Sequence, residues 1–277
     1  MCAMRHACAI AALFIAACAT GNTQTVTSAP VIEAERAFAA QAAQRGWAAA
    51  FRNHHAPGAI VLQPDPVEAA ITLAEVEGDG GTNLDWRPAY AGIARSADFG
   101  FTTGPFQIVG REGIIGHYFT VWRRQADGAW KWIFDAGTDV ADPGPAVALD
   151  ADIPTLPVAT HGAASADAAI AEVAALETAN ASPAALAALL ASDGRVNRVG
   201  APISIGPAAA ALLWTDSVAA YAPLQRQASS GGDMVFSMGR VTDQYEGAER
   251  VRYYARIWQK RAEGWRIVFD EIVPRRI

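Results

Sequence analysis

The first candidates for a general acid or base lie in the first half of the sequence: His54, His55, Asp65 and His117. An imidazole titrates near neutral pH, and a carboxyl can be tuned towards neutrality by burial, so both can transfer protons. His54 and His55 are adjacent, so on a helix they point about 100° apart and do not form a chelating pair. The two histidines equally suit a polar helix end, where positive charge is favoured by the helix dipole.

Asp65 lies in the sequence Pro64-Asp65-Pro66, which is typical of a turn. His117 begins a segment with strand character, so it could place a polar head in a pocket. One hypothesis is therefore an enzyme whose polar groups are His55, Asp65 and His117. Core packing, a turn and a helix end are the alternative interpretations of the same residues.

Sequence motifs of the common catalytic and cofactor sites are absent. The glycine-rich stretch 78–81 lacks the Lys-Ser/Thr of a phosphate loop, and there is no Gly-x-Ser-x-Gly or His-Glu-x-x-His. We therefore predict no cofactor and no metal ligands, although a Ser/His/Asp set that is dispersed in sequence stays open. The net charge of −6 argues against nucleic-acid binding. Hydrophobic residues make up 52 % of the chain, enough for a large core.

The stretch DGAWKWIFD at 127–135 predicts a β-strand after an Asp-Gly turn, joined as a hairpin to the strand that ends at Trp122. Strict alternation places Trp130, Trp132 and Phe134 on one face. Lys131, Ile133 and Asp135 fall on the other face. The bulky face is a core or the wall of a pocket.

The sequence EGWRIVFD at 263–270 repeats this strand, and the repeat extends upstream. Residues 98–104 match 233–239, Tyr118 matches Tyr254, and Trp130 matches Trp265, always at an offset of 135 or 136. A constant offset over several segments indicates a tandem duplication.

Each copy begins with helix-prone segments and ends in strands with period-2 alternation. We expect helices at 31–45, 47–54 and 67–76, and at 166–178, 183–190 and 207–214, with short strands at 59–62 and 195–199. The predicted fold class is α+β: two tandem cones at 31–137 and 164–277, each with about three helices on a curved antiparallel sheet. The proline-rich residues 138–163 are predicted to be a linker.

The first 17 residues have the charge and apolar run of a secretory signal. The run ends Ile15-Ala16-Ala17-Cys18, which resembles a bacterial lipobox, so Cys18 is the predicted lipidation site and 18–30 a tether; cleavage of a plain signal peptide is the alternative. Cys2, Cys8 and Cys18 are the three cysteines, so the folded part has no thiol. Ala19 follows the cysteine where some lipoproteins have aspartate, which resembles the pattern of lipoproteins sent to the outer membrane. These residues predict an exported protein on the periplasmic side, held to the membrane through its lipid alone.

The order of elements resembles the cone shared by nuclear transport factor 2, ketosteroid isomerase and SnoaL-type cyclases. The details resemble an uncharacterised SnoaL-like branch of exported bacterial proteins, and the matching residues are Glu33, Arg36, Phe38, Trp86, Pro88, 98–104, Tyr118, Trp122 and 127–131. The resemblance implies an apolar pocket inside each cone and an outer sheet face that dimerises. Intramolecular pairing of the two cones follows as a hypothesis. The candidate ligand contacts are Trp86, Tyr118, Trp122, Trp130 and Trp132.

The isomerase chemistry of this family is not matched residue by residue. The position of its base holds Gln63, with Asp65 two residues on, and its oxyanion aspartate is replaced by Thr120 and Arg256. We therefore favour binding of a small apolar ligand or an envelope protein partner. An isomerase, dehydratase or cyclase acting on a hydrophobic carbonyl compound in the first cone is the second hypothesis, and a structural assembly module is the third.

Overall fold

The computed structural model describes residues 25–78, 84–110, 112–113, 115–140, 142, 144, 146–213 and 219–275. The predicted signal peptide and Cys18 lie outside these residues. Within the described part of the chain, no helix is long and apolar enough to cross a membrane.

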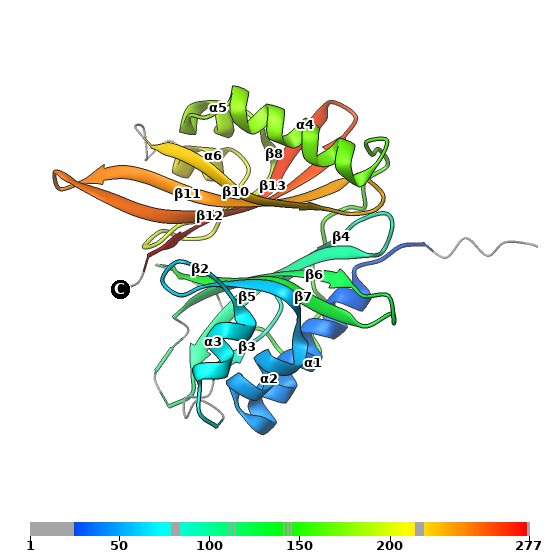
Figure 1. Cartoon of the computed structure of the whole chain (residues 1–277), viewed down its shortest axis with the longest axis vertical. Coiled ribbons are helices and arrows are strands. Elements are labelled where there is room, and N and C mark those ends of the chain that lie inside the picture. Colours follow the sequence, from blue (N-terminus) through cyan, green and yellow to red (C-terminus); the bar gives the residue numbers. More distant parts are fainter. Residues whose placement is uncertain are drawn as a thin grey trace, which may run out of the picture.

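The first unit is α+β, with three helices on one face of a seven-stranded sheet (Figure 1). Gly46 ends the first helix with a positive φ, and its N–H donates to the carbonyl of Ala42 at 2.9 Å, as a helix C-cap requires. The sheet order is β2-β1-β7-β6-β5-β3, with β4 paired to β5. The elements are α1 (Ala29–Arg45), α2 (Trp47–His54), β1 (His55–Leu62), β2 (Pro66–Glu68), α3 (Ala69–Glu75), β3 (Leu84–Trp86), β4 (Tyr90–Ile93), β5 (Phe99–Ile108), β6 (Gly116–Arg124) and β7 (Trp130–Asp139).

The second unit repeats this order with a six-stranded sheet, β10-β11-β12-β13-β8-β9. Its second helix is shorter than predicted, because the chain enters β8 at Leu190. The elements are α4 (Ala166–Ala179), α5 (Pro183–Ala187), β8 (Leu190–Asn197), β9 (Ser204–Ile205), α6 (Pro207–Leu213), β10 (Ala220–Ala228), β11 (Met234–Tyr245), β12 (Ala248–Arg261) and β13 (Gly264–Pro274).

Both sheets are mixed rather than purely antiparallel. The last strand of each unit pairs in parallel with the first long strand, β7 with β1 and β13 with β8, while its other edge pairs antiparallel in a hairpin. The chain between these parallel strands, one helix and the remaining strands of the sheet in each unit, makes the long connection that a parallel pair needs. The α+β prediction is confirmed, and its antiparallel detail is corrected at this one pair in each unit.

A β-bulge in the last strand changes the predicted alternation. Trp122 pairs with Trp132 but Val121 pairs with Phe134, so Ile133 is an extra residue in β7. Phe134 therefore leaves the face of Trp132, and the prediction that Trp130, Trp132 and Phe134 share one face is wrong for Phe134. The second unit repeats the feature, with Val268 as the extra residue of β13.

The two sheets pack face to face, with the helices on the outside (Figure 1). The rings of Phe119 and Phe269 stack with centroids 4.2 Å apart, and those of Phe134 and Phe236 lie 4.9 Å apart. One hydrophobic cluster contains buried residues from both sheets. The predicted intramolecular pairing of the two cones is thus present in the structure.

The pairing follows a pseudo-two-fold axis. The N–H of Arg95 donates to Asp233 Oδ2 at 2.9 Å, and the N–H of Ser230 donates to Asp98 Oδ2 at 3.0 Å. Each of these residues is related to its counterpart by the offset of 135. The interface is therefore isologous, like that of a symmetric dimer.

Candidate functional site

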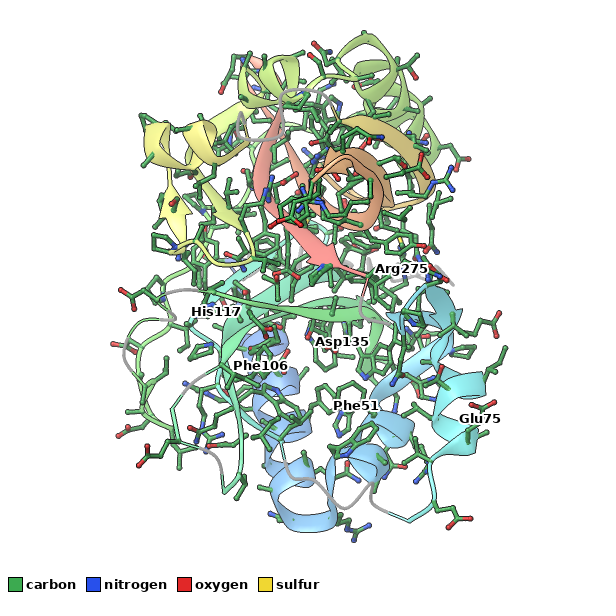
Figure 2. The ribbon with its side chains drawn as sticks, turned by 90° about the vertical axis from the view of Figure 1, so that its left-hand side faces the viewer. Phe51, Glu75, Phe106, His117, Asp135 and Arg275 are labelled. Atoms are coloured by element: carbon green, nitrogen blue, oxygen red, sulfur yellow. The ribbon has the colours of Figure 1, made fainter. Side chains whose placement is uncertain are left out.

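A cavity of about 440 Å³ lies inside the first unit, between its helices and the concave face of its sheet. Figure 2 looks into this region, with Asp135 above and Phe51 and Phe106 on either side. The lining is mostly apolar and aromatic: Phe38, Trp47, Phe51, Val61, Leu62, Gln63, Pro64, Thr72, Leu73, Leu84, Trp86, Phe106, Tyr118, Asp135, Ala136, Gly137, Val273 and Pro274. Small-molecule sites are usually apolar concavities that carry a few polar groups.

Asp135 is the one acidic side chain among the described residues that line the cavity. The bulge at Ile133 turns it inward, and the Thr120 hydroxyl on the neighbouring strand donates to its Oδ2 at 2.7 Å. Burial raises the pKa of Asp135 well above the usual value; the Thr120 hydrogen bond opposes this, while the negative charges of Glu35 and Glu271 add to it. The raised pKa favours the protonated form of Asp135, which can donate a hydrogen bond into the cavity.

Tyr118 brings a second polar head to the cavity from β6. Its hydroxyl is buried and has no hydrogen bond within the described part of the chain. Burial, followed by the charge of Glu35, raises the pKa of Tyr118 well above its usual value, so it stays a phenol. Tyr118 and Asp135 lie on the neighbouring strands β6 and β7, and both line the cavity.

Glu35 on α1 organises the layer behind this wall. Its fully buried carboxyl accepts hydrogen bonds from Trp86 Nε1 at 2.6 Å, from Trp122 Nε1 at 3.1 Å and from the Thr102 hydroxyl. Burial raises the pKa of Glu35 to about 7, against the lowering effect of these donors. The network fixes the Trp86 ring, which forms part of the cavity wall.

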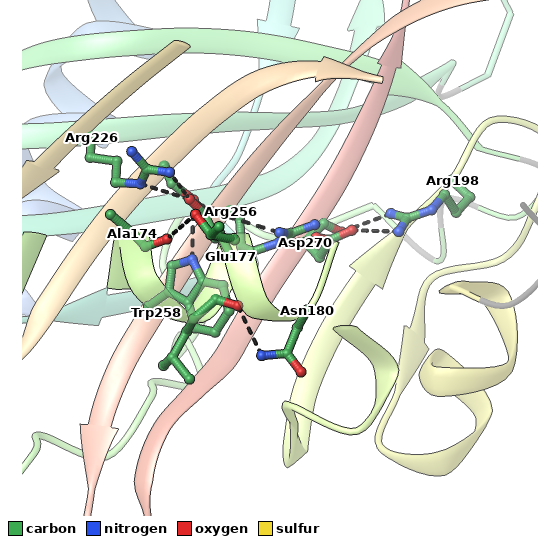
Figure 3. Close-up of polar contacts among 11 residues, drawn as sticks. Ala174, Glu177, Asn180, Arg198, Arg226, Arg256, Trp258 and Asp270 are labelled. Carbon is green, nitrogen blue, oxygen red and sulfur yellow. Dashed lines mark hydrogen bonds and ion pairs between the residues drawn. The ribbon is translucent and has the colours of Figure 1, made fainter. Parts of the chain in front are cut away.

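The second unit fills the equivalent space with charge (Figure 3). Arg256 stands where the first unit has Thr120, and its Nε lies 2.5 Å from Asp270 Oδ2. Arg198 pairs with the other oxygen of the same carboxylate. Arg256 is 1 % exposed and Asp270 is completely buried. Burial opposes ionisation of Asp270, but the two arginines outweigh it and lower its pKa.

Glu177 of α4 corresponds to Glu35 and keeps one equivalent partner, a hydroxyl on β11 where the first unit has one on β5. It accepts from the Ser237 hydroxyl at 2.6 Å, and Trp258 Nε1 donates to that hydroxyl at 3.1 Å. Arg226 adds an ion pair to Glu177 at 2.6 Å (Figure 3). The two units thus share one framework, but the arginines make the interior of the second a closed ionic network.

The three residues predicted to be catalytic lie in three different places, and none of them lines the cavity. His55 begins β1, with its ring 5.7 Å from that of Trp132 and its Nδ1 2.9 Å from the Ala56 carbonyl oxygen. Asp65 lies at the cavity mouth in an ion pair with Arg275. His117 is buried on the face of β6 opposite to Tyr118, towards the second unit (Figure 2). The structure does not bring His55, Asp65 and His117 together.

The predicted ligand contacts divide into two groups. Trp86 and Tyr118 line the cavity. Trp122 and Trp132 are completely buried behind its wall, and Trp130 packs beside them. These three aromatic residues support the wall rather than form its surface.

Asp135 and Glu35 are the polar residues that the sequence analysis missed. Strict alternation placed Asp135 on the far face from the tryptophans, and the bulge was not predicted. A usable signal was present, because Asp135 and Asp270 occur at the same place in both copies. Among the described residues, no group of three His, Cys, Asp or Glu side chains is placed to hold a metal ion.

Neither a protein-family model nor a curated protein matches this chain. Solved structures that resemble it include an NTF2-like protein with a cystatin-like fold from Novosphingobium aromaticivorans, at 22 % identity and a TM-score of 0.30, over 38 % of this chain and 80 % of that chain. Another is an NTF2-like protein of unknown function from Pseudomonas putida, at 13 % identity and a TM-score of 0.33, covering 39 % and 88 %.

A putative ketosteroid isomerase from Parabacteroides distasonis is similar at 10 % identity and a TM-score of 0.30, over 37 % of this chain and 84 % of that chain. Each match covers a part of this chain about the size of one unit.

Asp135 and Asp270 occupy equivalent positions in the two units, and we predict losses of stability of different size when each is replaced by asparagine. Asp135→Asn should change the free energy of unfolding by about 1 kcal/mol or less, because burial already favours the neutral form of this carboxyl. Asp270→Asn should cost about 3–5 kcal/mol, because it leaves two buried arginines without their carboxylate. Urea unfolding of both variants measures the difference, and equal losses would contradict the contrast.

Glu35 predicts a pH dependence of stability. Its pKa is about 7 in the folded protein, against 4.5 for an unperturbed glutamate, so between these values the folded state holds a proton that the unfolded state has released. Stability from this group is therefore greatest below pH 4.5 and falls as the pH rises to about 7, by an amount on the order of 3 kcal/mol. Glu35→Gln should make that decline shallower in urea titrations at several pH values. Glu33→Gln, an exposed change on the same helix, serves as control; an identical decline in Glu35→Gln would refute the assignment.

Proposed function

We propose that the first unit binds a small, uncharged, largely apolar molecule that carries a hydrogen-bond-accepting oxygen, such as a carbonyl. The observation that carries this proposal is an apolar cavity of about 440 Å³ whose lining includes one carboxyl, that of Asp135, with a pKa raised by burial. The volume lies within the range of small-molecule sites.

The electrostatics of the cavity favour a neutral ligand. None of the described residues that line it is basic, so a carboxylate or phosphate would lose its hydration without gaining a cation. Asp135 and Tyr118 instead offer O–H groups that a carbonyl oxygen accepts. The interior of the second unit, closed by Arg256 and Asp270, fits a structural role for that unit.

The second candidate function is an enzyme of the isomerase, dehydratase or cyclase type, acting in the same cavity. A carboxyl whose pKa is raised by burial suits general acid–base catalysis, which contributes about 10²–10⁴-fold to a rate. Asp135 would be the proton-transfer group in place of His55, Asp65 and His117. Asp135→Asn separates the two candidates, because it would keep binding but abolish exchange of the protons next to a bound carbonyl with deuterated water.

Binding is testable with N-phenyl-1-naphthylamine, an uncharged probe that fluoresces in apolar surroundings. The full chain should bind it, and Thr72→Trp should weaken the affinity about tenfold or more, because an indole would fill the cavity from α3. The matched control is Ile71→Trp, since Ile71 is the neighbouring residue on the same helix and is 56 % exposed. Equal binding by the two variants would place the probe elsewhere, and no binding by the wild type would refute the proposal.

We also propose that the protein is exported and anchored by lipid on Cys18, with a protein partner in the envelope as the alternative to a small ligand. The lipobox at 15–18 supports this, and two or more acyl chains make a stable anchor. Cys18→Ala should move the protein from the membrane fraction to the soluble one and remove incorporation of radiolabelled palmitate in a bacterial host. Unchanged fractionation and labelling would contradict it.

A further inference from the structure

The end wall of the cavity comes from the second unit. Val273 and Pro274, at the end of β13, line the cavity of the first unit together with Leu62 and Pro64. In β13, Asp270 points into its own cone, so Val273, three residues on, faces the other way, towards the first unit. Val273 is 5 % exposed, which shows that this wall is closely packed.

An ion pair fixes this wall at the mouth of the cavity. Arg275 follows the wall residues directly, and its Nε and Nη2 donate to the two oxygens of Asp65 at 2.7 and 2.8 Å. The Tyr253 hydroxyl, from β12, donates to the same carboxylate. Asp65 itself follows Gln63 and Pro64, which line the cavity. The contact therefore joins the mouth of the first unit to the last strand of the second.

The ion pair between Asp65 and Arg275 positions the end of β13 but contributes only weakly to stability. Asp65 and Arg275 are 50 % and 37 % exposed, so water screens their attraction. The paired, two-pronged geometry still gives the segment a defined position. The end of β13 thus contributes Val273 and Pro274 to the cavity of the first unit, while Arg256 and Asp270 form a buried ion pair in the second.

We propose that Val273 and Pro274 determine the length of the molecule that the cavity accepts, and that the Asp65–Arg275 pair holds them in place. The inference rests on the proposed function, since it concerns the same cavity. The second unit thereby supplies specificity to a site whose polar groups belong to the first. Asp65 acts as a positioning residue at the mouth.

The test uses the full chain and a homologous series of straight-chain 2-ketones that displace N-phenyl-1-naphthylamine. Val273→Ala should raise the preferred chain length by about one or two carbons, and Val273→Phe should lower it by about two or more, because the wall recedes or advances. Val241→Ala, a buried change on β11 away from the cavity, should leave the preferred length at the wild-type value.

Arg275→Gln gives an independent test on an exposed side chain, where folding is not at risk. It should broaden the range of ketones accepted within threefold of the best affinity, whereas Glu33→Gln, which removes another exposed ion pair, should not. An unchanged length preference in Arg275→Gln and both Val273 variants would overturn the inference while leaving the proposed function standing. Failure of the wild type to bind the probe or any ketone would overturn both.

Discussion

One extra residue in the last strand of each unit determines which side chains face the partner sheet and which face the interior of the unit. Ile133 in β7 and Val268 in β13 interrupt the alternation of the strand. Before the bulge, tryptophan or isoleucine side chains face the helices. After it, Phe134 and Phe269 face the partner sheet, and Asp135 and Asp270 face the interiors. The contact between the units and the chemistry inside them therefore depend on the same local irregularity.

The two interiors show that one scaffold can accommodate a buried carboxyl group in two different ways. A buried carboxyl can become neutral or acquire a cation, and each unit uses one of these options. Asp135 has only the Thr120 hydroxyl beside it, and burial raises its pKa, whereas Arg256 and Arg198 pair with Asp270 and lower its pKa. A buried carboxyl remains in both units, at Glu35 and Glu177, and each accepts a hydrogen bond from a hydroxyl that also accepts from a tryptophan.

The sequence predicted the fold well because its signals are local and repeated. Helix caps such as Gly46, the Asp-Gly turn and the constant offset between copies each report on nearby residues or on a direct comparison. The candidate site was predicted less well, because its members depend on a register that alternation alone does not reveal. Trp86 and Tyr118 were found as aromatic residues of the expected wall. Asp135 was missed at the bulge, and the distance between His55 and His117 follows from strand faces that only the assembled sheet defines.

The pseudo-two-fold interface has a consequence for how such a site can diversify. In a dimer of identical chains every substitution appears twice, so a change that closes one interior closes both. Joining the copies in one chain removes that restriction, and Arg256 stands in one copy alone. The connection at 138–163 also keeps the partner sheet at a fixed effective concentration, so the halves stay paired at dilutions where separate subunits would part. In a single chain, one half can thus hold a cavity while the other half completes its wall, at any concentration of the protein.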